Sequence, residues 1–259
     1  RDNWSGNRMK IIFISFFILL FNFSFPKETL GLVTKSKGKV EYQKFDSHKF
    51  TSNIKKGLGL YGDDQIRTGD NGFSIYRYLD DASSIKILKN SEVIIQGRVD
   101  SRKITKNIEV TNGLLNFNIN QQNDGYFTVV TPTSVATVKG TEFWLICNGV
   151  EGDKFLGVEG SVEVKNIESG QKVILNENST VVSTSNGDIV TQSMTTEDFQ
   201  QVDDLNDESG EYEDFDIDTG LNDDDPDSDT NTDSDDFNTI RIEFEDSLGN
   251  SKEIIIKYK

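Results

Sequence analysis

The sequence is poor in the residues that most active sites and disulfide frameworks require. Its 259 residues include one cysteine, Cys147, and one histidine, His48, which lie far apart along the chain. We therefore expect no internal disulfide, no structural zinc site with four nitrogen or sulfur ligands, and no Ser-His or Cys-His nucleophilic centre. His48 stands in a polar loop segment, and Cys147 shares the parity of apolar neighbours, which favours a small buried side chain.

Glycine patterns that bind phosphates or dinucleotides are also missing. Hydrolysis by two carboxylates needs only a pair of acids, so Glu109, Glu142 and Glu159 are the residues that composition leaves open. Acids on strands and turns are mostly solvated, however. The sequence therefore predicts a protein that is not an enzyme, with no catalytic residues, no cofactor and no metal site.

No apolar run is long enough for a typical membrane-spanning helix. The longest follows Met9-Lys10 and covers residues 11–21, whereas a span needs about 20 apolar residues. A basic start and a run of this length are typical of a signal peptide. We expect residues 1–30 to hold a few upstream residues and a signal peptide, and the protein to be exported, either periplasmic or at the cell surface or beyond. An uncleaved N-terminal anchor is the alternative, and it would be the only membrane contact.

Basic residues are not in excess. The formal net charge is −17, but residues 197–236 contain 19 acidic residues and no Lys or Arg. Removing these leaves 25 acidic against 27 basic residues. The chain thus combines a near-neutral part with an acidic tract that would repel phosphate backbones, and no nucleic-acid partner is expected.

The acidic tract is predicted to be a disordered linker over residues 191–238, because it has few apolar side chains and strong self-repulsion. Its alternating acids resemble a calcium loop counted from Asp227. The match to a calcium loop fails at the sixth position, where Thr232 replaces the glycine, and at the twelfth, where Asn238 replaces glutamate. Calcium binding is therefore a weak alternative for this segment.

Residues 31–190 carry the pattern of a folded β domain. Runs rich in Val, Ile, Phe and Thr recur every 8–12 residues, separated by Gly, Asn and Asp. This spacing predicts an all-β antiparallel sandwich or roll without a convincing amphipathic helix. Expected strands include residues 38–42, 73–79, 84–88, 93–96, 108–111, 114–119, 126–130, 142–147, 155–158, 162–165 and 180–183.

Five sequence elements, in a fixed order, resemble the FecR domain, an exported β domain named after the ferric citrate regulator. Together they span about residues 38–185. Ala82 replaces the glycine that is usual in the second element. The elements are Gly62–Gly69, Leu79–Ser83, Ile108–Leu115, Thr131-Pro132 with Ala136–Phe143, and Val158–Val164.

The resemblance implies an extracytoplasmic module for binding or signalling. Transmembrane regulators of this family carry a cytoplasmic segment that controls a sigma factor, followed by one span. Only residues 1–8 and the signal-like segment precede the exported domain here, so we expect a stand-alone exported FecR domain and no direct anti-sigma role. The expected partner is a protein or a cell-envelope component, in signalling or assembly. The alternative is a structural or adhesive cell-surface protein without a regulatory role.

Two further features bear on partners. Residues 239–259 alternate as two strands around a turn-like segment, which predicts a C-terminal β-hairpin. An isolated hairpin is marginal in water, so we expect it to dock on the main domain, to pair with another chain or to stay loosely formed. In the expected strand 142–147, Trp144 and Ile146 share the face opposite Phe143. They form a candidate partner surface unless a second layer of the domain covers them.

Overall fold

The computed structural model describes residues 27–52, 54–100, 103–122, 125–213, 238–245 and 251–258. The chain divides into two compact units, Arg1–Phe215 and Asp216–Lys259. The predicted signal peptide and the candidate calcium loop lie outside the described residues. No helix in the described ranges has the length and hydrophobicity needed to cross a membrane.

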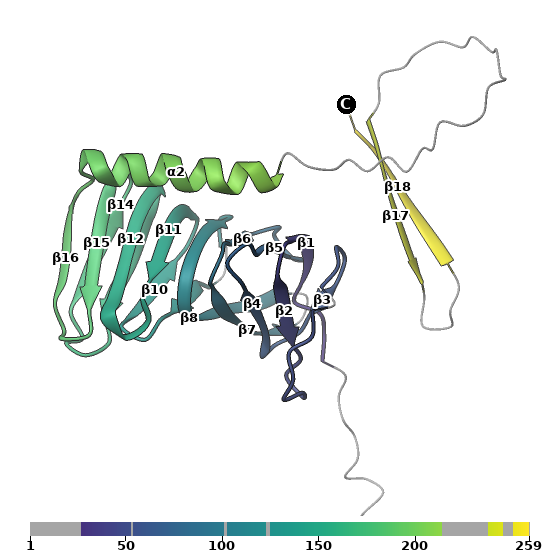
Figure 1. Ribbon diagram of the computed structural model, residues 1–259, viewed down its shortest axis with the longest axis horizontal. Coiled ribbons are helices and arrows are strands. Elements are labelled where there is room, and N and C mark those ends of the chain that lie inside the picture. Colours follow the sequence, from purple (N-terminus) through teal and green to yellow (C-terminus); the bar gives the residue numbers. More distant parts are fainter. Residues whose placement is uncertain are drawn as a thin grey trace, which may run out of the picture. The chain divides into compact units, whose positions relative to one another are not determined.

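The first unit is built from two β layers, as the alternating pattern predicts (Figure 1). Layer A has the strand order β3-β1-β5-β6-β8-β11-β12-β15-β16. Its bounds are β1 Gly31–Lys37, β3 Gly59–Leu60, β5 Phe73–Tyr78, β6 Ser84–Ile87, β8 Lys103–Ile119, β11 Thr141–Cys147, β12 Gly152–Glu159, β15 Ser179–Thr184 and β16 Ile189–Ser193.

Layer B has the order β2-β4-β7-β8-β9-β10-β13-β14. All described pairings are antiparallel except that of β8 with β9. A short 3₁₀ turn, η2 Gly149–Glu151, connects β11 to β12. The remaining bounds are β2 Val40–Gln43, β4 Asp64–Thr68, β7 Glu92–Asp100, β9 Phe127–Val130, β10 Ser134–Val138, β13 Ser161–Asn166 and β14 Lys172–Asn176.

Strand β8 belongs to both layers. Its first half pairs with β7 and β9 in layer B, and its second half pairs with β6 and β11 in layer A. The sequence predicts two strands here, whereas the structure has one continuous strand. Gly113 lies at the crossing with φ +132°, and a Cβ there would come within 2.2 Å of Ser91 Oγ. Glycine therefore lets the strand bend between layers without ending.

The main core fills the space between the layers. Aromatic rings form its centre: Tyr78 and Phe127 meet edge to face at 5.7 Å, and Phe117 contacts Phe127 at 6.0 Å. Phe117 also stacks on Phe143 at 5.0 Å between centroids. These side chains are fully buried. Each alternates along its strand with residues on the outer faces, so the period of two in the sequence builds this core.

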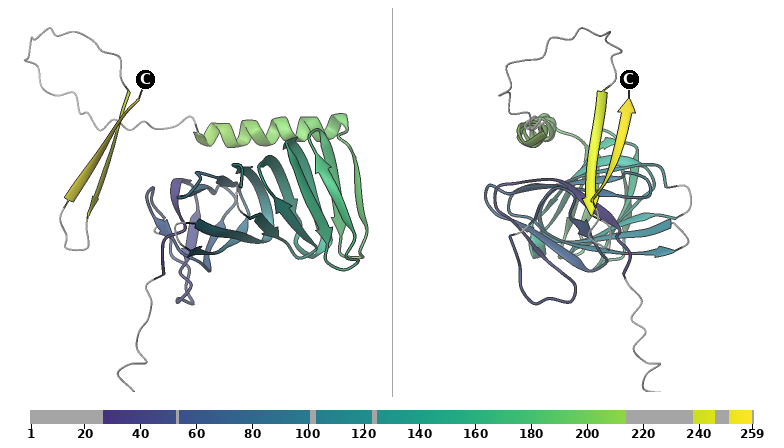
Figure 2. Two further views of the ribbon diagram at one scale, coloured as in Figure 1. Left: turned by 180° about the vertical axis from the view of Figure 1, so that it is seen from behind. Right: turned by 90° about the vertical axis from the view of Figure 1, so that its right-hand side faces the viewer.

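Helix α2, Thr196–Glu213, corrects the prediction of a disordered segment beginning at residue 191. It lies across the outer face of layer A, from β16 toward β5, in both views (Figures 1 and 2). Its buried positions Asp198, Leu205 and Ser209 and the partly buried Val202 follow helical spacing. The sequence pattern is weak because only two of these four side chains are apolar, so tertiary contacts with layer A stabilise the helix.

The N-terminus of α2 has a reciprocal cap. The amide of Asp198 donates to Thr195 Oγ1 at 3.2 Å, and Asp198 Oδ2 accepts from the amide of Thr195 at 2.9 Å. This is a capping box, in which two amides without helical partners are satisfied together. The spacing Thr195-x-x-Asp198 is thus the sequence signal that could have predicted the helix.

The second unit contains a two-stranded antiparallel hairpin of β17, Asn238–Glu245, and β18, Ser251–Tyr258. Its register runs from Asn238 opposite Tyr258 to Glu245 opposite Ser251. The predicted strand pair is therefore present. Whether it docks or pairs with another chain stays a prediction.

Candidate functional site

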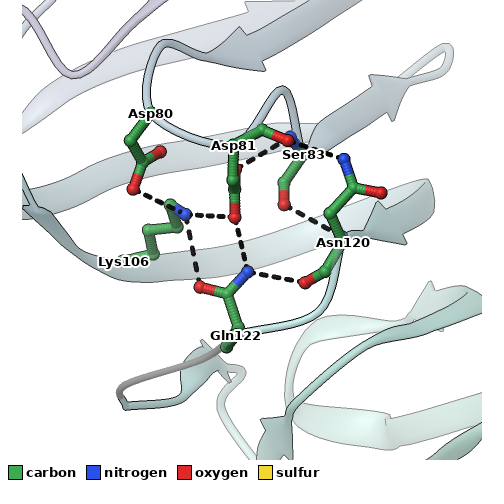
Figure 3. Close-up of polar contacts among 6 residues, drawn as sticks. All are labelled: Asp80, Asp81, Ser83, Lys106, Asn120 and Gln122. Atoms are coloured by element: carbon green, nitrogen blue, oxygen red, sulfur yellow. Dashed lines mark hydrogen bonds and ion pairs between the residues drawn. The ribbon is translucent and has the colours of Figure 1, made fainter.

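The turn between β5 and β6 carries the element Leu79–Ser83 and reaches a buried lysine on β8. Lys106 is only 2% exposed. Figure 3 shows its ammonium group surrounded by side chains from the turn and from the segment after β8. We call this set the hairpin clamp. Its members are Asp80, Asp81, Ser83, Lys106, Asn120 and Gln122.

Within the hairpin clamp, Lys106 Nζ has three acceptors, one for each of its hydrogens. It donates to Asp80 Oδ2 at 2.9 Å, to Asp81 Oδ2 at 2.5 Å and to Gln122 Oε1 at 3.2 Å. Asp81 Oδ2 also accepts from Gln122 Nε2 at 2.5 Å. The ammonium group is therefore fully engaged, and the turn of layer A is tied to the layer B half of β8.

The electrostatics of the hairpin clamp fit a structural role. Burial by itself would raise the pKa of Asp81. Hydrogen bonds from Lys106, from the amide of Ser83 and from Gln122 outweigh burial, and the pKa lies below its ordinary value. A carboxylate held ionised and already bonded on one side to an ammonium is a poor general base. The network therefore fixes the fold and leaves no group poised for catalysis.

A second buried carboxylate lies under the Thr131-Pro132 element. Asp153 is 2% exposed, and its Oδ2 accepts from Thr131 Oγ1 at 2.5 Å and also from Thr133 Oγ1. Thr131 Oγ1 in turn accepts from the amide of Ser134 at 2.8 Å. The segment before β10 is thus joined to β12 through one carboxylate, which Thr131 and Thr133 bond.

Cys147 is buried, as its strand parity predicts, and it lies opposite Asp153 in the β11–β12 register. Burial, followed by the negative charge of Asp153, raises the pKa of the thiol to about 12. A thiol with this pKa is protonated at neutral pH and a weak nucleophile. His48 is exposed and lies on a different segment, so the structure does not bring the two residues together.

Of the three acids left open by composition, Glu142 and Glu159 lie opposite each other, and Glu109 lies elsewhere on β8. Glu109 lies on the layer B part of β8 and accepts from Gln96 Nε2 at 3.1 Å. Glu142 and Glu159 are neighbours across β11 and β12, at a register shift next to a turn. Glu142 also accepts from Asn116 Nδ2 at 3.2 Å.

Of the two alternatives left open for Trp144, the structure shows the covered one, so Trp144 does not form an exposed partner surface. The side chain is fully buried on the outer face of layer A. It belongs to a second apolar cluster, which α2 covers with Leu205 and Val202, and Ile146 is partly buried against the same cluster. The covering layer is a helix, which the sequence analysis did not anticipate. The cluster comprises Phe73, Leu88, Trp144, Leu156 and Leu205.

Two ion pairs hold α2 on this cluster, and we call them the helix clamp. Lys154 Nζ lies 2.6 Å from Asp198 Oδ1 near the first turn, and Lys89 Nζ lies 3.1 Å from Glu208 Oε1 further along. Asp198 Oδ2 also accepts from Thr180 Oγ1 at 2.9 Å. The outer face of layer A therefore binds an acidic segment through lysines that border an apolar floor.

Burial of Asp198 by itself would raise its pKa. Hydrogen bonds from Lys154, from the amide of Thr195 and from Thr180 outweigh burial and lower the pKa to about 2. The carboxylate therefore stays ionised at all but strongly acidic pH. Local sequence patterns could not predict the helix clamp, because the two residues of each ion pair lie far apart along the chain.

Comparisons with known proteins agree with the motif order. Residues 64–163 match the family model described as FecR protein, which confirms the predicted resemblance over this part of the chain. No curated protein matches the chain. Two crystal structures of a candidate anti-sigma factor from Parabacteroides distasonis are 18% identical to it, with TM-scores of 0.43 and 0.42. Each alignment covers 51% of this chain and 61% of that protein, so the chain spans less than two thirds of its length.

Proposed function

We propose that this chain, whose residues 64–163 carry a FecR domain, is a non-enzymatic extracytoplasmic binding module. Its partner is a protein or another component of the cell envelope, and the binding serves envelope signalling or assembly. The FecR match is the observation that carries this proposal. A domain that binds a partner acts through the surfaces that it presents.

The interior of the first unit supports a binding role over a catalytic one. Lys106, Asp81 and Asp153 are engaged with neighbouring polar groups and hold segments of the fold together. Cys147 is buried and protonated at neutral pH. Ionisable groups with altered pKa values are common at active sites. In this unit, Asp81 and Cys147 have altered pKa values, and both are engaged in contacts within the fold. The outer surfaces are left for recognition.

The predicted signal peptide supports the extracytoplasmic part of the proposal. The basic start and apolar run of residues 9–21 have the length of a signal peptide core. An expressed, C-terminally tagged chain should therefore be recovered outside the cytoplasm. Its N-terminal segment should either be cleaved off or stay attached and anchor the chain in the membrane. Mass measurement of the purified protein distinguishes these two forms. The matched control is Leu19→Arg, which interrupts the run and should leave the chain in the cytoplasm.

Partner capture tests the binding part. Cross-linking in intact cells, followed by purification and mass spectrometry, should recover one envelope protein or envelope polymer in stoichiometric amounts. Recovery of the wild-type chain from the cytoplasm would contradict export. Absence of any cross-linked envelope component, with the chain correctly exported, would contradict the binding role and favour a structural surface protein.

A further inference from the structure

A polar groove lies on the outer face of layer A, beyond the strands that α2 covers most fully. It is formed by β1, β5, β6 and β8, which lie together in Figure 1. The groove has a volume of about 440 Å³. Three cationic side chains and three neutral polar side chains line it: Lys35, Arg77, Lys86, Thr34, Ser84 and Asn118.

Strand register places the three cations close to one another. Lys35 lies opposite Ile75, which lies opposite Lys86 on the next strand. Two strand spacings separate Lys35 from Lys86, which is about 10 Å. Arg77 follows Ile75 by two residues on the same face and lies opposite Ser84. The positive charges therefore surround a small area that one short ligand segment could contact.

No carboxylate lines this groove among the described residues. Within the same part of the chain, neither Lys35 nor Arg77 has an ion-pair partner. The neighbouring strand β11 does carry Glu142, opposite Asn118 in the register, and it accepts a hydrogen bond from Asn116. One side of the groove is thus bordered by an acid that limits how far an anion can extend toward β11.

The face that contains the groove already binds one acidic segment. Lys154 and Lys89 hold α2 through Asp198 and Glu208, and the helix rests on the apolar cluster around Trp144. Ile75, which lies between Lys35 and Lys86, packs partly buried against the same cluster. The groove is therefore continuous with an established contact surface for carboxylates, in which lysines surround an apolar floor.

We infer that this groove binds an acidic peptide segment of a partner protein through Lys35 and Arg77. Arg77 would bind a carboxylate through two parallel N–H donors, and Lys35 would contact a neighbouring acid as a point charge. Thr34, Ser84 and Asn118 would hydrogen-bond the backbone or polar side chains of the segment. This inference rests on the proposed binding function and assigns its surface and the chemistry of its partner.

The test measures binding of a fluorescent peptide of alternating Asp and Ser to the full chain, beside a peptide of Asn and Ser. The acidic peptide should bind, more weakly as salt is added, and the neutral one should not. Lys35→Glu with Arg77→Glu should weaken binding at least about tenfold, because attraction becomes repulsion. The matched control, Lys49→Glu with Lys165→Glu, makes the same change in net charge at exposed sites on other segments and should bind as wild type does.

Several results would overturn the inference. Equal losses in the two double variants would mean a general effect of net charge. Tighter binding of inorganic triphosphate than of the acidic peptide would assign the groove to a phosphate ligand. Binding that occurs only after Asp223–Asp225 are changed to Asn would mean that the acidic tract of the chain occupies the groove in place of a partner.

The same variants separate this inference from the proposed function. If the Lys35→Glu, Arg77→Glu chain captures its envelope partner as well as wild type does, the groove assignment fails and the binding role stands. If neither chain captures a partner, the proposed function fails whatever the peptide measurements show. Circular dichroism of both double variants establishes that each is folded before the binding comparison.

Discussion

The hairpin clamp and the helix clamp use the same chemistry in different surroundings. Lys106 has a side chain 1% exposed and bonds two carboxylates. In the helix clamp, the side chains of Lys154 and Lys89 are 30% and 42% exposed. An ion pair near water contributes little to stability, whereas removing one partner of a buried pair leaves an unpaired charge. The hairpin clamp should therefore stabilise the whole domain, and the helix clamp should mainly orient α2 on an apolar surface that supplies the binding energy.

The largest effect is expected where that apolar surface is deepest. Trp144→Ala should lower the free energy of unfolding by about 3–5 kcal/mol, because it removes a fully buried indole between layer A and α2. Chemical denaturation followed by circular dichroism measures the loss. Trp144→Phe is the matched control and should cost far less, since Nε1 of Trp144 has no hydrogen-bond acceptor among the described residues. A loss below about 1 kcal/mol for the alanine variant would mean that α2 contributes no packing.

The next largest effect tests the hairpin clamp alone. Lys106→Met should destabilise the domain by about 3 kcal/mol, because Asp80 and Asp81 lose the cation that compensates their charges. The control is Lys172→Met, which breaks an exposed pair with Glu163 at 2.8 Å and should change stability by less than about 1 kcal/mol. Thermal unfolding of both variants makes the comparison. Equal losses would show that burial does not distinguish the two kinds of ion pair.

The sequence predicted the inner layers far better than the outer cover. Alternation with a period of two specifies which residues of β5 or β11 face the core, so Phe143 was correctly assigned. The same alternation cannot say what covers the other face, so for Trp144 a partner surface and a covering layer both stay open in the sequence. The helix over it has acidic residues at four of its eight described exposed positions and only a short apolar stripe, so its composition resembles that of a disordered linker.

The candidate sites show the same division. The turn carrying Asp81 could be found from its motif, because the element is local in sequence. Its partner Lys106 could not, since 25 residues separate the two and only the crossing of β8 between layers brings them together. The groove around Arg77 likewise depends on the pairing of four strands. Contacts of this kind are set by topology, which local patterns do not encode.

The pH-dependent stability that the helix clamp contributes should be smaller than the effects of the Trp144 and Lys106 substitutions, and its loss should be confined to acidic pH. The pKa of Asp198 is lowered from its ordinary value of 3.8 to about 2, so its contribution is present above about pH 4 and is lost as the pH falls toward 2. In a Trp4→Phe background, fluorescence reports Trp144 alone and should shift to longer wavelength as α2 loosens. Asp198→Asn should remove the acid-dependent part of this transition. An unchanged acid transition in that variant would assign it to other carboxylates.

The smallest effect concerns strain in the turn that carries the hairpin clamp. Ala82 has φ +60°, in the left-handed region that favours glycine, and it stands where the family motif usually has glycine. An L-residue other than glycine loses roughly 1 kcal/mol or more in this conformation, although glycine costs more chain entropy on folding. Ala82→Gly should therefore raise the free energy of unfolding by up to about 1 kcal/mol and leave the Lys106 contacts unchanged. The control is Ala136→Gly, at a buried strand position, which should destabilise the domain. Denaturant titration of the two variants measures the difference, and a loss of stability at position 82 would show that the clamp holds the turn without appreciable strain.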